Sequence, residues 1–74
     1  MNKIYLIRKG RMFSEGYLLD FYFLTKQKAE IYLREVEKMK KTKQEDGSYL
    51  FEEYMQPIKN WAWIEDYYLY GTPL

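Results

Sequence analysis

The chain has 74 residues, with 12 Lys and Arg against 11 Asp and Glu, a net charge of +1, and neither Cys nor His. This length suits one domain, 1–74, and the absence of Cys and His removes disulfides, thiolate zinc sites and the commonest general base. The sequence therefore argues against most enzymes, predicts no metal or cofactor, and lacks the strongly basic character typical of nucleic-acid-binding proteins.

The first part of the chain predicts a β-hairpin. Residues 3–8 and 17–23 are rich in Ile, Leu and aromatic residues, and Gly10 and Gly16 bound a long tip over residues 9–16. The apolar run within the first strand spans only residues 4–7, whereas a membrane span needs about 20 apolar residues. We therefore expect a soluble, cytoplasmic protein with no membrane association.

A helix is predicted over residues 26–41. One apolar stripe recurs at helical spacing, and Thr25 precedes it as the natural N-cap. The order of charges also predicts an i,i+4 pair between Glu37 and Lys41. The stripe consists of Ala29, Tyr32, Leu33, Val36 and Met39.

Two further strands are predicted after a return segment at 42–48 that contains Asp46-Gly47. They span 49–55 and 61–70, with a turn at 56–60 and a short tail at 71–74. The predicted fold is therefore α+β, with one helix packed on an antiparallel sheet of about four strands in the order β-β-α-β-β.

The chain has more aromatic side chains than one helix and four strands can bury. A helix of this length shades roughly 240 Å², whereas four strands present a face of roughly 380 Å². Both sides of the second and last strands are mostly apolar or aromatic. Four arrangements would account for the uncovered face. Its tyrosine hydroxyls could be hydrated, or a strongly coiled sheet could curl round the helix and bury it. It could also be an interface between two copies of the chain or a recognition surface. We expect a homodimer or an aromatic docking face.

Seven residues are candidates for binding a partner. The hairpin tip holds an adjacent Met and Phe beside Arg11, which either fold back on the sheet or project as an anchor with a basic collar. The remaining candidates are aromatic residues of the predicted strands. The full set is Arg11, Met12, Phe13, Tyr22, Trp61, Trp63 and Tyr67.

Charge is uneven along the chain. Residues 1–44 hold eleven basic and five acidic residues, and residues 45–74 hold one basic and six acidic residues. Interleaved strands would cancel these charges locally, and segregated halves would leave one basic and one acidic surface. Basic residues among aromatics also leave a single-stranded nucleic-acid-binding module open as an alternative function.

Catalysis would have to rest on carboxylates. Glu52-Glu53 and Glu65-Asp66 are sequence neighbours on predicted strands, so the two members of each pair point to opposite faces. We interpret them as solvated edge charges.

The whole pattern resembles small orphan proteins encoded by phages of low-GC Gram-positive bacteria. The residues that carry this resemblance are 3–7, 21–30 and 61–65, Trp-Ala-Trp-Ile-Glu in the last case. Proteins of this kind commonly inhibit host replication, transcription or defence stoichiometrically, and the chain is also similar to a staphylococcal-phage inhibitor of the host DNA sliding clamp. The resemblance implies a non-enzymatic inhibitor that acts in the host bacterial cytoplasm and occludes a host bacterial protein, with the clamp as the specific expectation. Leu50-Phe51 matches the end of clamp-docking pentapeptides, without their leading Gln.

Overall fold

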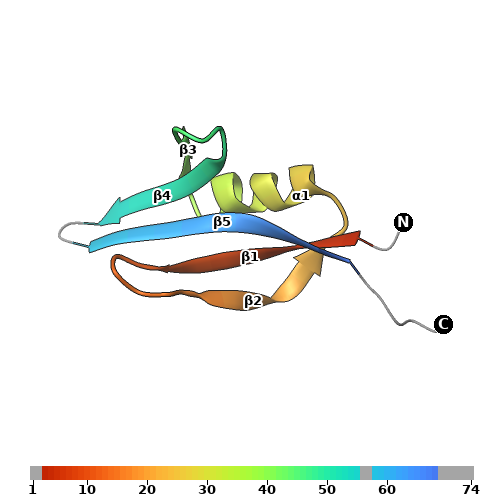
Figure 1. Cartoon of the computed structure of the whole chain (residues 1–74). Coiled ribbons are helices and arrows are strands. Elements are labelled where there is room, and N and C mark those ends of the chain that lie inside the picture. Colours follow the sequence, from red (N-terminus) through yellow and green to blue (C-terminus); the bar gives the residue numbers. More distant parts are fainter. Residues whose placement is uncertain (1–2, 56–57, 69–74) are drawn as a thin grey trace.

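The protein is described here from a computed structural model that covers residues 3–55 and 58–68. One helical segment packs on a five-stranded, entirely antiparallel sheet with the spatial order β2-β1-β5-β4-β3 (Figure 1). The elements are β1 Lys3–Arg11, β2 Tyr17–Phe23, α1 Lys26–Ile31, the π-helix η1 Tyr32–Val36, β3 Lys40–Lys43, β4 Tyr49–Met55 and β5 Ile58–Tyr68.

The α+β class is confirmed, but the prediction of four strands in the order β-β-α-β-β is wrong by one strand. The fifth strand is β3, which pairs with β4 and comes from residues assigned to the end of the helix and the return segment. The strands β1 and β5 are also longer than predicted, and β5 includes residues 58–60 of the predicted turn. The rest of that turn, 56–57, and the tail, 71–74, lie outside the described residues, as do 69–70 of the predicted last strand.

The helix begins as predicted and ends early. The Thr25 hydroxyl accepts a hydrogen bond from the Lys28 amide at 3.1 Å, so it is the N-cap. After Ile31 the helix widens into π geometry, with the Glu37 amide bonded to the Tyr32 carbonyl. Lys38 then takes a positive φ of 59°, which reverses the chain and prevents the helix from reaching residue 41.

The wider turn changes which side chains meet the sheet. Glu37 accepts hydrogen bonds from Tyr32 and from Lys9 of β1, whereas Val36 is 63% exposed. The predicted pair between Glu37 and Lys41 is therefore wrong, since Lys41 instead bonds Glu30. The core between helix and sheet consists of Ile7, Ala29, Leu33, Met39, Phe51 and Ala62.

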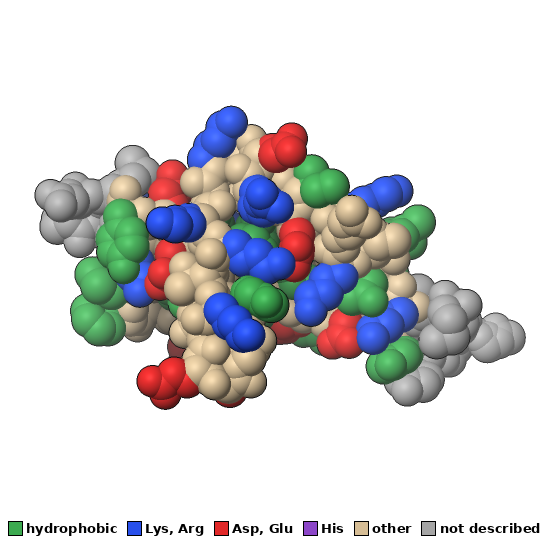
Figure 2. Space-filling view, turned by 90° about the horizontal axis from the view of Figure 1, so that it is seen from above, with side chains coloured by type: hydrophobic (Ala, Val, Ile, Leu, Met, Phe, Trp, Pro, Cys, Tyr) green, Lys and Arg blue, Asp and Glu red, His purple; other side chains and the backbone are tan. Residues whose placement is uncertain are grey.

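The basic and acidic parts of the chain interleave. The basic strand β1 lies beside the acidic strand β5, where Lys3 pairs with Asp66 and Arg8 with Glu65. Figure 2 looks down on the side that carries α1 and β3, and Lys and Arg side chains spread over its middle with Asp and Glu between them. The basic charges of β1 and the acidic charges of β5 therefore cancel locally.

Candidate functional site

The strand registers separate the aromatic residues into two sheet faces. Ile7 of β1 and Ile64 of β5 are partners and lie on the face that the helix covers. Because side chains alternate along a strand, the neighbouring residues of β5 lie on the opposite face. We call that uncovered surface, with the residues of the other strands that share it, the aromatic face.

A row along β5 forms the centre of the aromatic face. Trp61 and Trp63 stack with ring centroids 4.7 Å apart and an interplanar angle of 22°. Glu65 and Tyr67 continue the row toward the end of the strand. Trp63 and Tyr67 remain 38% and 37% exposed, so large apolar area on this face is open to a partner.

Glu65 ties the row together. Its carboxylate accepts hydrogen bonds from Arg8 Nε at 2.7 Å, from Trp63 Nε1 at 2.7 Å and from the Tyr67 hydroxyl. Burial alone would raise the pKa of Glu65, but these three donors outweigh it, so its pKa is lowered. The carboxylate therefore stays ionised at neutral pH and fixes the two aromatic rings.

The loop between β1 and β2 is held against Trp61. The Trp61 indole donates to the Arg11 carbonyl at 2.8 Å, and Ser14 closes the loop through two hydrogen bonds of its hydroxyl to the Arg11 backbone. Gly10 and Gly16 flank the same ring: an added Cβ would lie 2.9 Å from Trp61 Cζ2 at Gly10 and 2.5 Å from Cη2 at Gly16. The loop is thus anchored at its base.

Phe13 projects from this anchored loop. It adopts a positive φ of 69° and is 97% exposed, whereas Met12 is 40% exposed. Of the two arrangements that the sequence left open for the loop, Phe13 takes the projecting one. Beside it lies a groove of about 370 Å³ lined by Met12, Phe13, Ser14, Leu50, Lys59, Trp61 and Trp63.

The seven predicted binding residues are only partly gathered. Arg11, Met12, Phe13, Trp61 and Trp63 surround the loop and the groove, and Tyr67 lies farther along β5 beyond Glu65. Tyr22 pairs with Leu6 and lies on β2, separated from β5 by β1.

The polar residues that organise this face are not among the residues predicted from the sequence to bind a partner. Glu65 was interpreted as a solvated edge charge, although it alternates in phase with Trp61, Trp63 and Tyr67 and so had to share their side of the strand. Nothing in the sequence pointed to Arg8 as its partner, because that contact depends on the pairing of β1 with β5.

The carboxylates that follow one another in sequence do point apart, as predicted. Glu65 contacts Arg8 on the aromatic face, whereas Asp66 contacts Lys3. Within residues 3–55 and 58–68, no group of three or more acidic residues is arranged to hold a metal ion. No helix in the same part of the chain has the length and apolar character needed to cross a membrane.

The Leu50-Phe51 dipeptide lies within β4. Phe51 is 1% exposed and belongs to the core, so this segment cannot present its phenyl ring to a clamp in the folded protein. Comparisons of the chain with models of protein families, with curated proteins and with solved structures found no match.

Proposed function

We propose that this protein works without catalysis, by binding a protein partner through its aromatic face. The single observation that carries the proposal is Phe13, which is 97% exposed on a loop anchored at its base by Trp61. Exposing a phenyl ring costs roughly 2 kcal/mol relative to burying it. An anchored loop that holds such a ring in water beside an apolar groove has the character of a binding hot spot.

The charges of the aromatic face favour a protein over a nucleic acid. Arg8 is paired with Glu65, and Lys59 is paired with Glu52 on the same face. Cations that are already neutralised release few counterions from a phosphate backbone. A protein surface of mixed charge and apolar character matches this arrangement better.

The resemblance to phage-encoded inhibitors makes a bacterial host protein the proposed target, and the DNA sliding clamp the first to test. Wild-type protein, Phe13→Ser and Val36→Ser are immobilised and exposed to lysate of a low-GC Gram-positive bacterium. Val36 is the matched control, because it is also exposed but lies on η1, outside the aromatic face. We expect a host protein that is retained by wild type and Val36→Ser and lost with Phe13→Ser.

Purified clamp is then titrated against the same three proteins. Binding that Phe13→Ser weakens at least tenfold supports the clamp as the target. Equal retention of every host protein by Phe13→Ser and wild type would refute the role of the aromatic face.

Single-stranded nucleic acid is the second candidate, because stacked indoles next to Arg8 resemble the platforms on which bases stack. A fluorescence titration with an unstructured oligonucleotide tests it. Tight binding with a steep salt dependence, together with no protein retained from lysate, would favour this function.

A further inference from the structure

A second surface lies where β4 leaves β5. The two strands are paired from Met55 and Ile58 as far as Phe51 and Ala62. Beyond Ala62, β5 continues to Tyr68 and is paired with β1 alone among the described strands. The sheet therefore has an internal free edge, produced by the departure of β4 toward β3 (Figure 1).

The backbone groups on this free edge can be assigned. The Lys59 carbonyl accepts a hydrogen bond from the Met12 amide, so the backbone of Lys59 points toward β1. The register of β1 with β5 is continuous, and backbone groups alternate in direction along a strand. Ile64 and Asp66, an odd number of residues from Lys59, therefore point their N–H and C=O groups toward the side that β4 has left.

The Asp66 side chain lies beside this edge. Its pKa is lowered mainly by a hydrogen bond from Lys3, and the Lys26 charge adds to the effect. The ion pair between Lys3 and Asp66, at 2.9 Å, leaves the backbone of Asp66 out of that contact.

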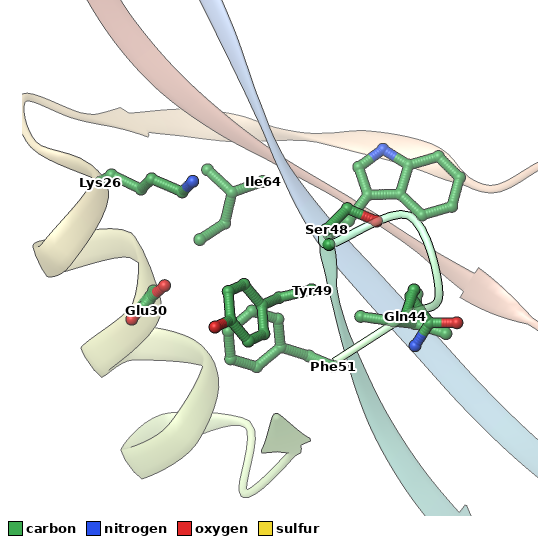
Figure 3. A pocket seen from close by; sticks show the side chains of 10 residues that line it. Lys26, Glu30, Gln44, Ser48, Tyr49, Phe51 and Ile64 are labelled. Carbon is green, nitrogen blue, oxygen red and sulfur yellow. The ribbon is translucent and has the colours of Figure 1, made fainter. Parts of the chain in front are cut away.

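A cleft lies beside this edge. It has a volume of about 530 Å³, within the range of about 300–1,000 Å³ typical of ligand sites. Figure 3 shows Lys26 and Glu30 reaching from α1 toward Tyr49, Phe51 and Ile64, so the cleft has apolar walls and a charged rim.

The two charged side chains of the rim differ in their availability. Glu30 is already paired with Lys41 at 3.0 Å. Lys26 has no ion pair within 4 Å in the described part of the chain, and its charge acts on Asp66 only from a greater distance, so its ammonium group can donate to an acidic ligand group.

We propose that the free edge of β5 at Ile64 and Asp66 binds an extended peptide segment of a partner protein, which adds to the sheet as a further strand. Its backbone would bond these two residues, one apolar side chain would enter the cleft between Ile64 and Tyr49, and an acidic side chain would pair with Lys26. This inference does not depend on Phe13, which does not line the cleft, although Trp63 lines both the cleft and the groove beside Phe13.

The test begins with a yeast-displayed library of random twelve-residue peptides, selected against wild-type protein. We expect enriched peptides with alternating apolar residues and at least one Asp or Glu. Recovery of no peptide would overturn the proposal, as would peptides whose affinity is the same for wild type and Lys26→Glu.

The matched control is Lys28→Glu, which makes the same charge change two residues along α1, at an exposed position outside the cleft. We expect Lys26→Glu to weaken the selected peptides at least tenfold and Lys28→Glu to weaken them less than threefold. Acidic residues near a helix N-terminus stabilise the helix, so lost affinity would not reflect unfolding of α1.

Amide hydrogen exchange distinguishes strand addition from other binding. A selected peptide should slow exchange at Ile64 and Asp66 at least tenfold and leave Trp63 and Glu65 unchanged, because those amides point toward β1. N-methylation of the peptide residues whose amides face β5 should abolish binding, whereas N-methylation of the residues between them should preserve it. Binding that tolerates N-methylation at both sets of residues would overturn strand addition. Slow exchange at Ile64 and Asp66 in a dimer without peptide would also overturn it, because a second copy of the chain would then occupy the edge.

Discussion

Gly16 and Gly47 both adopt positive φ, at 78° and 90°, but in different surroundings. An added Cβ at Gly16 would lie 2.5 Å from Trp61 and 2.8 Å from the Lys9 carbonyl, whereas at Gly47 it would meet nothing within 4 Å. We expect Gly47→Ala to cost about 1–2 kcal/mol through its φ alone. Gly16→Ala should cost about 1–3 kcal/mol more, through overpacking.

Chemical denaturation of the two variants measures this difference in the free energy of unfolding. The two substitutions share the positive φ, so their difference isolates the contact with Trp61. Equal losses of stability would show that the loop does not depend on that contact.

The lowered pKa of Glu65 predicts that the stability of the protein depends on pH. Its lowered pKa in the folded state stabilises the protein above the unfolded value of about 4.3, and this contribution is lost as pH falls through the folded pKa. Glu65→Gln should therefore lower the free energy of unfolding by roughly 1 kcal/mol at pH 7. The difference in stability between the variant and wild type should begin to narrow as pH falls below about 4.3 and should close as pH falls through the folded pKa of Glu65.

Urea unfolding at pH 7 and pH 3 checks this expectation. Glu35→Gln serves as the control, because Glu35 is exposed and forms no ion pair in the described part of the chain. If the difference in the free energy of unfolding between Glu65→Gln and wild type were the same at pH 3 as at pH 7, the charge of Glu65 would not be its cause.

At the scale of elements, the end of the helical segment depends on Lys38. Its φ of 59° is strained for a residue with a side chain and free of strain for glycine. Lys38→Gly should therefore raise the free energy of unfolding by about 0.5–1 kcal/mol.

Lys40→Gly is the matched control, since it removes the same side chain from the exposed edge strand β3, where glycine is unfavourable. We expect it to lower stability. Thermal unfolding followed by circular dichroism compares the two, and destabilisation by Lys38→Gly would contradict the left-handed conformation.

The elements that could be predicted from the sequence are those that neighbouring residues encode. The hairpin strands, the strand at 49–55 and the Thr25 cap are all encoded by neighbouring residues, and the structure has them. The early end of the helix had no such signal, because Met39 continues the apolar stripe and is buried as the stripe requires, although it follows the reversal at Lys38. A buried Met is compatible with either path of the chain.

The strand β3 was missed for a related reason. Its sequence, Lys-Lys-Thr-Lys, has low strand propensity, and it is a strand because β4 offers it an edge to pair with. The site shows the same limit: Trp61, Trp63 and Phe13 are visible as aromatic residues, but the groove among them exists only once β1, β4 and β5 are side by side.

At the scale of the whole molecule, the aromatic face also bears on self-association. The sequence predicts a homodimer, and a second copy would compete with any partner for Phe13 and the groove beside it. We expect light scattering after size exclusion to give twice the monomer mass for wild type and Val36→Ser. Phe13→Ser should give the monomer mass, and a dimer that survives this substitution would place the contact on another surface.

The stacked indoles of Trp61 and Trp63 have a spectroscopic consequence. Two identical chromophores at 4.7 Å share their excited states, so the protein should show a paired positive and negative ultraviolet dichroism signal that a single tryptophan cannot produce. The sheet thereby supplies an intrinsic, label-free reporter at the centre of the aromatic face. Any molecule that wedges between the rings or tilts one of them would change this signal at the moment of docking.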